Sequence, residues 1–166
     1  EILINEKPSA VLVYGDTNST LATAIAASKI HVPIVHIEAG LRSFNKKMPE
    51  EINRILCDHS STLLFSPTKT GYQNLIQEGF SSSLTLNASM DQPNVYHCGD
   101  VMYDNSIYFS NLSDEKSTIV QDLDLQKNKY ILSTVHRNDN TDNTDNLNAI
   151  FSSFISITEF HKMKLI

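Results

Sequence analysis

Short apolar runs rich in β-branched residues alternate along this chain with stretches that have the apolar spacing of helices. The apolar runs occupy residues 10–14, 34–37, 62–66, 95–98 and 130–134. Strands that alternate with helices form βαβ units, in which successive strands are parallel and the helices cover the sheet. The pattern therefore predicts an α/β protein built on parallel sheets.

Several helix boundaries carry their own signals. Thr17 or Asn18 can cap the first predicted helix, Pro49 opens the second, and Gly79 ends the third. Residues 81–93 are rich in Ser and Asn and have no periodicity, so a surface loop is expected there. The predicted helices cover residues 17–29, 49–57, 68–78, about 103–112 and about 145–161.

The order of these elements predicts two Rossmann-like domains, neither of them complete. Residues 1–112 are expected to form most of a first domain whose start is missing, and residues 129–166 the start of a second. The polar stretch 113–128 is the expected junction. The chain begins without Met and ends in a segment resembling the opening of a strand, so we expect it to be an internal fragment.

The composition argues against several classes of partner. Thirteen Lys and Arg face nineteen Asp and Glu, a net charge of −6, whereas a nucleic-acid binder needs a basic face. No apolar run approaches the ~18–20 residues of a membrane helix. Cys57 and Cys98 have neither metal-type nor CxxC spacing, which favours reduced thiols in a cytosolic protein.

Two carboxylates directly follow predicted strands. Asp16 comes after Gly15 at the end of the first apolar run, and Glu38 follows the second, before Gly40. In open α/β sheets ligands bind at the carboxyl ends of the strands, so both acids are candidates for chemistry. Asp16 could instead cap the following helix, and Glu38 could be a buried acid paired with Arg42.

Two further groups have a functional and a structural interpretation. Glu50 and Glu51 open a helix that also carries Arg54, and such a pair usually interacts with the helix dipole and with a base at i+3 or i+4. His136 and Arg137 end a predicted strand, where an imidazole can act as acid or base and a guanidinium can hold phosphate. A solvated loop histidine is the alternative. No Walker-type loop, GxGxxG fingerprint or GxSxG elbow occurs.

Six short motifs together resemble the non-hydrolysing UDP-N-acetylglucosamine 2-epimerase family. They occur in the family's order and span nearly the whole chain, which makes the set far more specific than any one motif. The motifs are YGDTNST from Tyr14, HIEAGLR from His36, PEEINR from Pro49, FSPT from Phe65, GDVMYD from Gly99 and TVHR from Thr134.

The resemblance implies a GT-B-like architecture of two Rossmann-like domains, with the sugar nucleotide between them. The implied reaction inverts C2 of a UDP-linked 2-acetamido sugar, as from UDP-N-acetylglucosamine to UDP-N-acetylmannosamine. UDP leaves by anti elimination to give a 2-acetamidoglucal and then adds back, in a pathway that supplies surface polysaccharide precursors. No cofactor, metal, nucleic acid or membrane partner is implied; a cytoplasmic homodimer is expected for the full-length protein.

The resemblance also assigns roles to particular residues. Asp16 and Glu38 match catalytic acids expected to act as acid and base near C2, and which of them removes the proton is left open. Glu50 matches a carboxylate that supports the charged transition state. His136 matches a catalytic histidine that faces the diphosphate or the leaving oxygen.

Three arginines and one loop bear on the substrate. Arg42, Arg54 and Arg137 are candidate substrate-binding residues that orient carboxylates or phosphate. Residues 43–48 form a shorter segment than in many UDP-N-acetylglucosamine enzymes and look more like relatives acting on UDP-2,3-diacetamido-2,3-dideoxyglucuronic acid. A hydrolysing relative, a GT-B glycosyltransferase and an inactive nucleotide-binding fragment are the alternatives.

Overall fold

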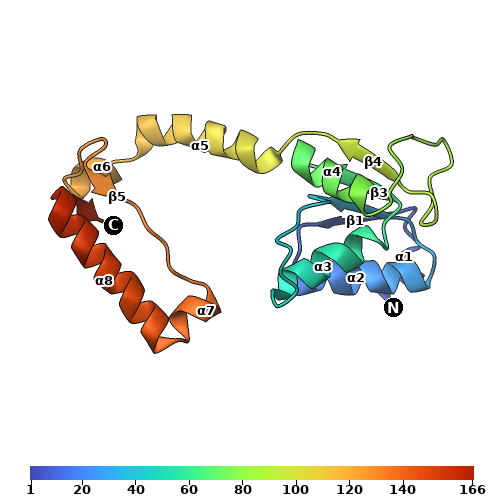
Figure 1. Cartoon of the computed structure of the whole chain (residues 1–166). Coiled ribbons are helices and arrows are strands. Elements are labelled where there is room, and N and C mark those ends of the chain that lie inside the picture. The colour runs from blue at the N-terminus through green and yellow to red at the C-terminus, as the bar shows by residue number, and fades with distance from the viewer. The chain divides into compact units, whose positions relative to one another are not determined.

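A computed structural model describes all residues from Glu1 to Ile166. The chain forms two compact units, Glu1–Ile107 and Tyr108–Ile166 (Figure 1). The boundary between the units falls within helix α5 (Val101–Lys116), which also contains residue 112, where the sequence predicts the first domain to end.

The first unit is built on a four-stranded parallel sheet. Its strands are β1 (Val11–Tyr14), β2 (Ile34–Ile37), β3 (Leu63–Ser66) and β4 (Asn94–His97), and they lie in that order. All three neighbouring pairs are parallel, which confirms the predicted α/β class. Parallel pairing brings the carboxyl ends of all four strands to one edge of the sheet.

Helices connect these strands, and their ends follow the sequence signals. Between β1 and β2 lies α2 (Asn18–Lys29), capped by the Thr17 side chain, which accepts from the Thr20 amide. Between β2 and β3 lies α3 (Pro49–Asp58), with proline in its first turn. Between β3 and β4 lies α4 (Lys69–Gln77), capped by Thr68. A short helix, α1 (Ile2–Glu6), precedes the sheet.

One face of the sheet carries the buried core. Val13, His36, Leu64 and Val95 are register partners and form a row across the four strands. Val13 packs in a cluster with residues of α2 and α3, and Leu64 packs with Leu75 of α4. His36 is therefore an ionisable side chain in the middle of an apolar row, and it is fully buried.

The second unit contains one βαβ element. Strands β5 (Tyr130–Ile131) and β6 (Lys164–Leu165) pair in parallel, and α8 (Thr144–His161) connects them. Two four-residue helices, α6 (Ile119–Asp122) and α7 (Asn138–Thr141), lie in segments where the sequence predicts a junction and a loop. None of the helices in either unit combines the length and apolar character that crossing a bilayer requires.

Candidate active site

Three carboxylates follow three strands at the carboxyl edge of the first unit's sheet. Asp16 lies two residues after β1, Glu38 directly after β2, and Asp100 between β4 and α5. All three are half-buried. The sequence predicts Asp16 and Glu38 at this edge, and the structure adds Asp100.

The Glu38 carboxylate lies over the backbone of Gly15. A Cβ built on Gly15 would stand only 3.2 Å from Glu38 Oε2, and Gly15 has a φ of +70°. Both observations explain why glycine precedes Asp16, since a side chain would crowd the carboxylate and strain the backbone. Glu38 itself has a φ of +78°, a conformation uncommon for a residue other than glycine.

The surroundings of Glu38 favour its protonated form. Burial raises the pKa of the Glu38 carboxyl above its ordinary value, and the negative charges of Asp16 and Asp100 raise it further. The positive charges of His36 and Arg54 act in the opposite direction. A carboxyl with a raised pKa can take up and release a proton closer to neutral pH, as an acid–base catalyst must.

Helix α3 holds the Asp16 loop. Arg54 Nε and Nη2 each lie 2.8 Å from Asp16 Oδ2, and Arg54 Nη1 lies 3.2 Å from Glu51 Oε2. The Asn53 side-chain amide donates to the backbone carbonyl of Asp16 at 2.8 Å. Asp16 is therefore fixed through both its backbone and its carboxylate.

The same helix holds the loop after Glu38. The Glu51 carboxylate accepts hydrogen bonds from the backbone amides of Ser43 and Phe44 at 2.8 and 2.9 Å. Burial alone would raise the pKa of Glu51, but these hydrogen bonds and the charge of Arg54 outweigh it and lower the pKa. Glu51 is thus an ionised anchor for the loop.

The structure decides several of the alternatives that the sequence leaves open. Thr17, not Asp16, caps α2. Arg42 pairs with Asp58 and Glu78, not with Glu38. In the first turn of α3 the partner of Arg54 is Glu51 at i, i+3, as the structural interpretation expects, whereas half-buried Glu50 forms no ion pair.

A buried histidine–aspartate pair lies beneath the carboxylates. His36 Nδ1 is 2.6 Å from Asp58 Oδ1, and both side chains are fully buried. His36 Nε2 is 2.9 Å from the carbonyl oxygen of Gly15. Burial lowers the pKa of His36, but the hydrogen bonds and charges of Asp58 and Cys57 together outweigh it and raise the pKa to about 10.

Arg42 extends this pair into a network. Its Nη1 lies 2.8 Å from Asp58 Oδ2, and its Nε and Nη2 each donate to the Glu78 carboxylate at 2.7 Å. The Arg42 side chain is only 1% exposed, so its guanidinium is enclosed by these partners. Arg42 thus holds two carboxylates of the chain, and its expected role in substrate binding stays a prediction.

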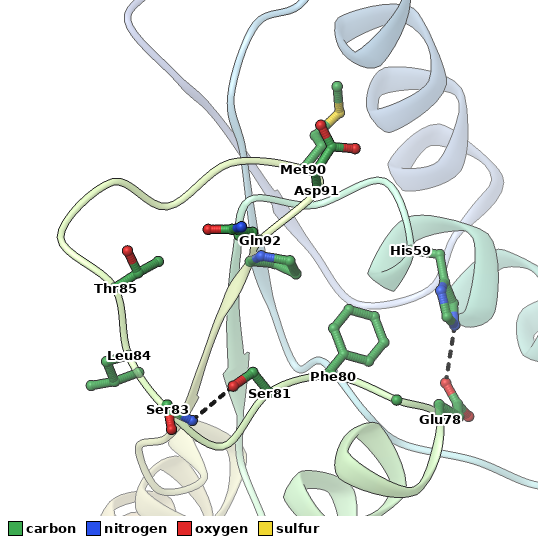
Figure 2. Close-up of a pocket in the computed structure, with 12 residues that line it drawn as sticks. His59, Glu78, Phe80, Ser81, Ser83, Leu84, Thr85, Met90, Asp91 and Gln92 are labelled. Carbon is green, nitrogen blue, oxygen red and sulfur yellow. Dashed lines mark hydrogen bonds and ion pairs between the residues drawn. The ribbon is translucent and has the colours of Figure 1, made fainter.

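A cavity of the first unit lies away from the three carboxylates at the sheet edge. It has a volume of about 550 Å³ and lies between the ends of α3 and α4 and the loop before β4 (Figure 2). His59, which is 3.3 Å from Glu78, lines it with Phe80, and none of the three carboxylates does. No group of three or more His, Cys, Asp or Glu side chains is arranged to hold a metal ion.

His136 and Arg137 belong to the second unit. Both are exposed, and Arg137 immediately precedes α7, whose first turn donates to its carbonyl oxygen. Their catalytic and phosphate-binding roles stay predictions.

Comparison with known proteins identifies the family. The family model described as UDP-N-acetylglucosamine 2-epimerase matches residues 1–166. The chain belongs to this family.

Several epimerase relatives are closely similar. A UDP-N-acetylglucosamine 2-epimerase homolog of Methanococcus maripaludis is 50% identical over 96% of this chain, and a UDP-2,3-diacetamido-2,3-dideoxy-D-glucuronate 2-epimerase of Pseudomonas aeruginosa is 47% identical over 95%. The matches cover 42% and 41% of those two proteins, so the chain spans about two fifths of their length.

Solved epimerase structures share the fold. The crystal structure of Methanocaldococcus jannaschii UDP-GlcNAc 2-epimerase, in complex with UDP-GlcNAc and UDP, aligns with a TM-score of 0.79 at 34% identity. The alignment covers 99% of this chain and 42% of that one. It supports the α/β, GT-B-like fold class expected from the sequence.

Two residues of this epimerase chain that matter for the site were not singled out from sequence. Asp100 repeats the Gly-Asp pattern at the end of a strand, already seen at Gly15 and Asp16, and that repeat was the available signal. Asp58 ends α3, where the helix dipole disfavours an acid, so an unusual set of donors could have been suspected.

Proposed function

We propose that the protein carrying this chain inverts C2 of a UDP-linked 2-acetamido sugar, by eliminating UDP and adding it back. Membership of the epimerase family supports this activity. The solved relative bound to UDP-GlcNAc and UDP supports a UDP-sugar substrate. The observation that carries the proposal is the Glu38 carboxylate, held over Gly15 with its pKa raised by burial and by two neighbouring acids.

The chemistry explains why several carboxylates are needed. In the elimination, a base takes the proton from C2, the C–H pair forms the C1–C2 double bond, and the C1–O bond breaks so that UDP leaves with its electron pair. Re-addition reverses these steps after a proton reaches the other face of C2. Asp16 and Glu38 exchange protons at C2, and Glu50 stabilises the positive charge that develops as UDP leaves.

The remaining candidate residues orient the Asp16 carboxylate or act on the diphosphate of the substrate. Arg54 holds the Asp16 carboxylate by two contacts of 2.8 Å. His136 and Arg137 are proposed to act on the diphosphate, since imidazole can protonate the leaving oxygen and guanidinium can bind phosphate oxygens.

The test uses the full-length protein that carries this sequence. It is incubated with UDP-N-acetylglucosamine in D₂O, and the products are followed by proton NMR. Wild type is expected to incorporate deuterium at C2 and to form UDP-N-acetylmannosamine. Glu38→Gln keeps the shape of the side chain but removes its basicity, so its exchange rate should fall by about 100-fold or more, the lower part of the range for acid–base groups.

An exposed acid on α5 supplies the matched control. Glu115→Gln makes the same chemical change away from the sheet edge and should leave exchange unchanged. If the Glu38→Gln variant exchanges deuterium as fast as wild type, Glu38 has no catalytic role. Release of free N-acetylmannosamine and UDP would assign the protein to the hydrolysing type.

A second substrate is favoured by a specific comparison. The Pseudomonas aeruginosa relative, 47% identical, is named for UDP-2,3-diacetamido-2,3-dideoxy-D-glucuronate. If wild type gives no exchange with UDP-N-acetylglucosamine but does so with this nucleotide, the diacetamido-uronic acid sugar is the substrate. No exchange with either sugar would contradict the proposed activity.

We also propose that the enzyme works in the cytoplasm as a homodimer and supplies precursors of surface polysaccharide. Cys57 and Cys98 are both free thiols, as expected in a reducing compartment. Light scattering coupled to size-exclusion chromatography of the full-length protein measures the oligomeric state, and a monomer would contradict that part of the proposal.

A further inference from the structure

Asp58 collects hydrogen-bond donors from three different groups. Its Oδ1 faces His36 Nδ1 at 2.6 Å, and its Oδ2 accepts from the Gly40 backbone amide at 3.0 Å and from Arg42 at 2.8 Å. The carboxylate is fully buried at the last residue of α3, where the helix dipole disfavours negative charge. These donors are what make an ionised acid tolerable there.

The contacts of Asp58 reach the Glu38 loop directly and the Asp16 loop through His36. His36 lies two residues before Glu38, and Gly40 lies two residues after it. The Asp58 carboxylate therefore holds a residue on each side of Glu38, through the His36 ring and the Gly40 backbone amide. The other ring nitrogen of His36 lies 2.9 Å from the carbonyl oxygen of Gly15, the residue before Asp16. A single chain of contacts therefore runs from Asp58 to both proposed acid–base groups.

The partners of His36 also define its protonation. One ring nitrogen faces a carboxylate and the other faces a carbonyl oxygen, and both of these accept hydrogen bonds. Both nitrogens must therefore donate, which makes the ring an imidazolium with Asp58 as its counterion. Neutral imidazole could satisfy only one of the two acceptors.

We propose that Asp58 is a positioning residue for epimerisation, which fixes Glu38 directly through Gly40 and His36, and fixes Asp16 through the contact of His36 with Gly15. Glu38 has a left-handed backbone conformation, which persists only where neighbouring structure holds it. Asp58 supplies that support without contacting the sugar. The inference rests on the proposed function, because it assigns a role in the same site.

The first test is Asp58→Asn in the full-length protein. The asparagine oxygen can still accept from Gly40 and Arg42, but its amide group faces His36 Nδ1 and forces the ring to become neutral. The backbone of the Asp16 and Glu38 loops then keeps its conformation, while the ion pair between His36 and Asp58 is lost. We expect kcat for C2 inversion to fall about tenfold to 100-fold, because small errors in orientation cost that much, with KM nearly unchanged.

A second variant removes the contact between His36 and the Gly15 carbonyl oxygen. In His36→Asn, the amide nitrogen can replace Nδ1 as the donor to Asp58, but nothing reaches the Gly15 carbonyl. The Asp16 loop loses its link while Asp58 keeps a partner, and kcat should again fall more than KM rises. This variant also serves if Asp58→Asn does not fold.

Asp114→Asn is the matched control. It makes the same chemical change as Asp58→Asn at an exposed acid of α5. Asp114 is not among the groups that bind Asp58, His36 or Arg42, so kcat and KM should stay at the wild-type values. ¹⁵N NMR of His36 supplies an independent readout: two protonated ring nitrogens in wild type, and one in Asp58→Asn.

The outcomes separate the two proposals. No C2 exchange by wild type with either UDP-sugar overturns the proposed function, and the role of Asp58 with it. Exchange by wild type with kcat unchanged in folded Asp58→Asn and in His36→Asn overturns the role of Asp58 alone. A neutral His36 ring in wild type also contradicts the inference.

Discussion

At the scale of single residues, opposing charges around the Glu38 carboxyl group set its pKa. Burial, Asp16 and Asp100 raise the pKa of Glu38, while His36 and Arg54 counteract them. The balance means that a change in any one neighbour alters the pH at which Glu38 ionises. Asp100 is the most useful neighbour to change, since no role in the reaction is assigned to it.

Asp100→Asn should move the acidic limb of the kcat/KM profile to lower pH. Removing a negative charge makes ionisation of Glu38 easier, so its pKa falls and the base form persists to lower pH. Asparagine can still accept the amide hydrogen bond from Met102, so the start of α5 is kept. The measurement is kcat/KM of the full-length enzyme as a function of pH.

The matched control is Asp104→Asn. Asp104 is an exposed acid in the first turn of α5, and it is not among the charges that act on Glu38. Its profile should coincide with that of wild type. An acidic limb that moves upward in Asp100→Asn, or moves equally in both variants, would contradict the proposal that ionised Glu38 takes part in proton exchange at C2.

At the scale of elements, α3 organises the site. Glu51, Arg54 and Asp58 are spaced three and four residues apart, so they share one face of the helix. Glu51 binds the loop after Glu38, and Arg54 binds the Asp16 carboxylate. Asp58 binds the His36 ring and the Gly40 backbone amide. One helix therefore orients two strand-end loops.

Gly40→Ala should disrupt the packing of the β2 loop on α4. Gly40 has a φ of +82°, and a Cβ there would stand 2.3 Å from the Gly71 carbonyl oxygen, so backbone must move. Gly79 has a φ of +100° but no heavy atom within 4 Å of a Cβ, so Gly79→Ala measures the backbone strain alone. We expect about 1–2 kcal/mol from strain in Gly79→Ala and a clearly larger loss in Gly40→Ala.

The measurement is the melting temperature of each variant of the full-length protein beside wild type. Equal losses in the two variants would mean that the close approach of Gly40 to α4 contributes nothing to stability. The activity of Gly40→Ala should also fall, because Gly40 donates to Asp58 next to Glu38.

Much at this scale could be predicted because local chemistry decides it. Strand β2 lies at the predicted residues 34–37, Thr17 caps α2, and Pro49 begins α3, each from a signal within a few residues. Helices α6 and α7 were not predicted, because four residues are too few to show a helical period.

The candidate site also has features that the sequence predicts and features that depend on tertiary packing. Convergence of Asp16 and Glu38 follows from the parallel sheet, which sequence pattern predicts. The partners of Arg42 could not be predicted, since Asp58 and Glu78 lie far from it in sequence and only tertiary packing brings them together. The same holds for His36 and Asp58, which are 22 residues apart.

At the scale of the whole molecule, β1 is an edge strand of the four-stranded sheet. Its residues Leu12 and Tyr14 are 61% and 42% exposed. An exposed edge with apolar side chains is a template for pairing with another chain. We therefore expect a chain of residues 1–166, prepared by itself, to associate as its concentration rises.

Leu12→Lys should reduce this association, because a charge on an edge strand opposes strand pairing. Leu86→Lys adds the same charge at a fully exposed leucine in the loop before β4 and should reduce it less. Static light scattering against concentration compares the three proteins. Equal effects of the two lysines would mean that net charge, and not the β1 edge, controls association.

The network under the site has a consequence for how this sequence can evolve. His36 and Arg42 carry two positive charges and Asp58 and Glu78 two negative ones, so the set, whose side chains are buried except for that of Glu78, is neutral as a whole. Replacing one member leaves the charge of its partner uncompensated in a site with little water. Such a single substitution lowers the stability of the protein, so selection acts against it. These four positions are therefore expected to drift as a group: descendants should keep the full set or exchange several members together.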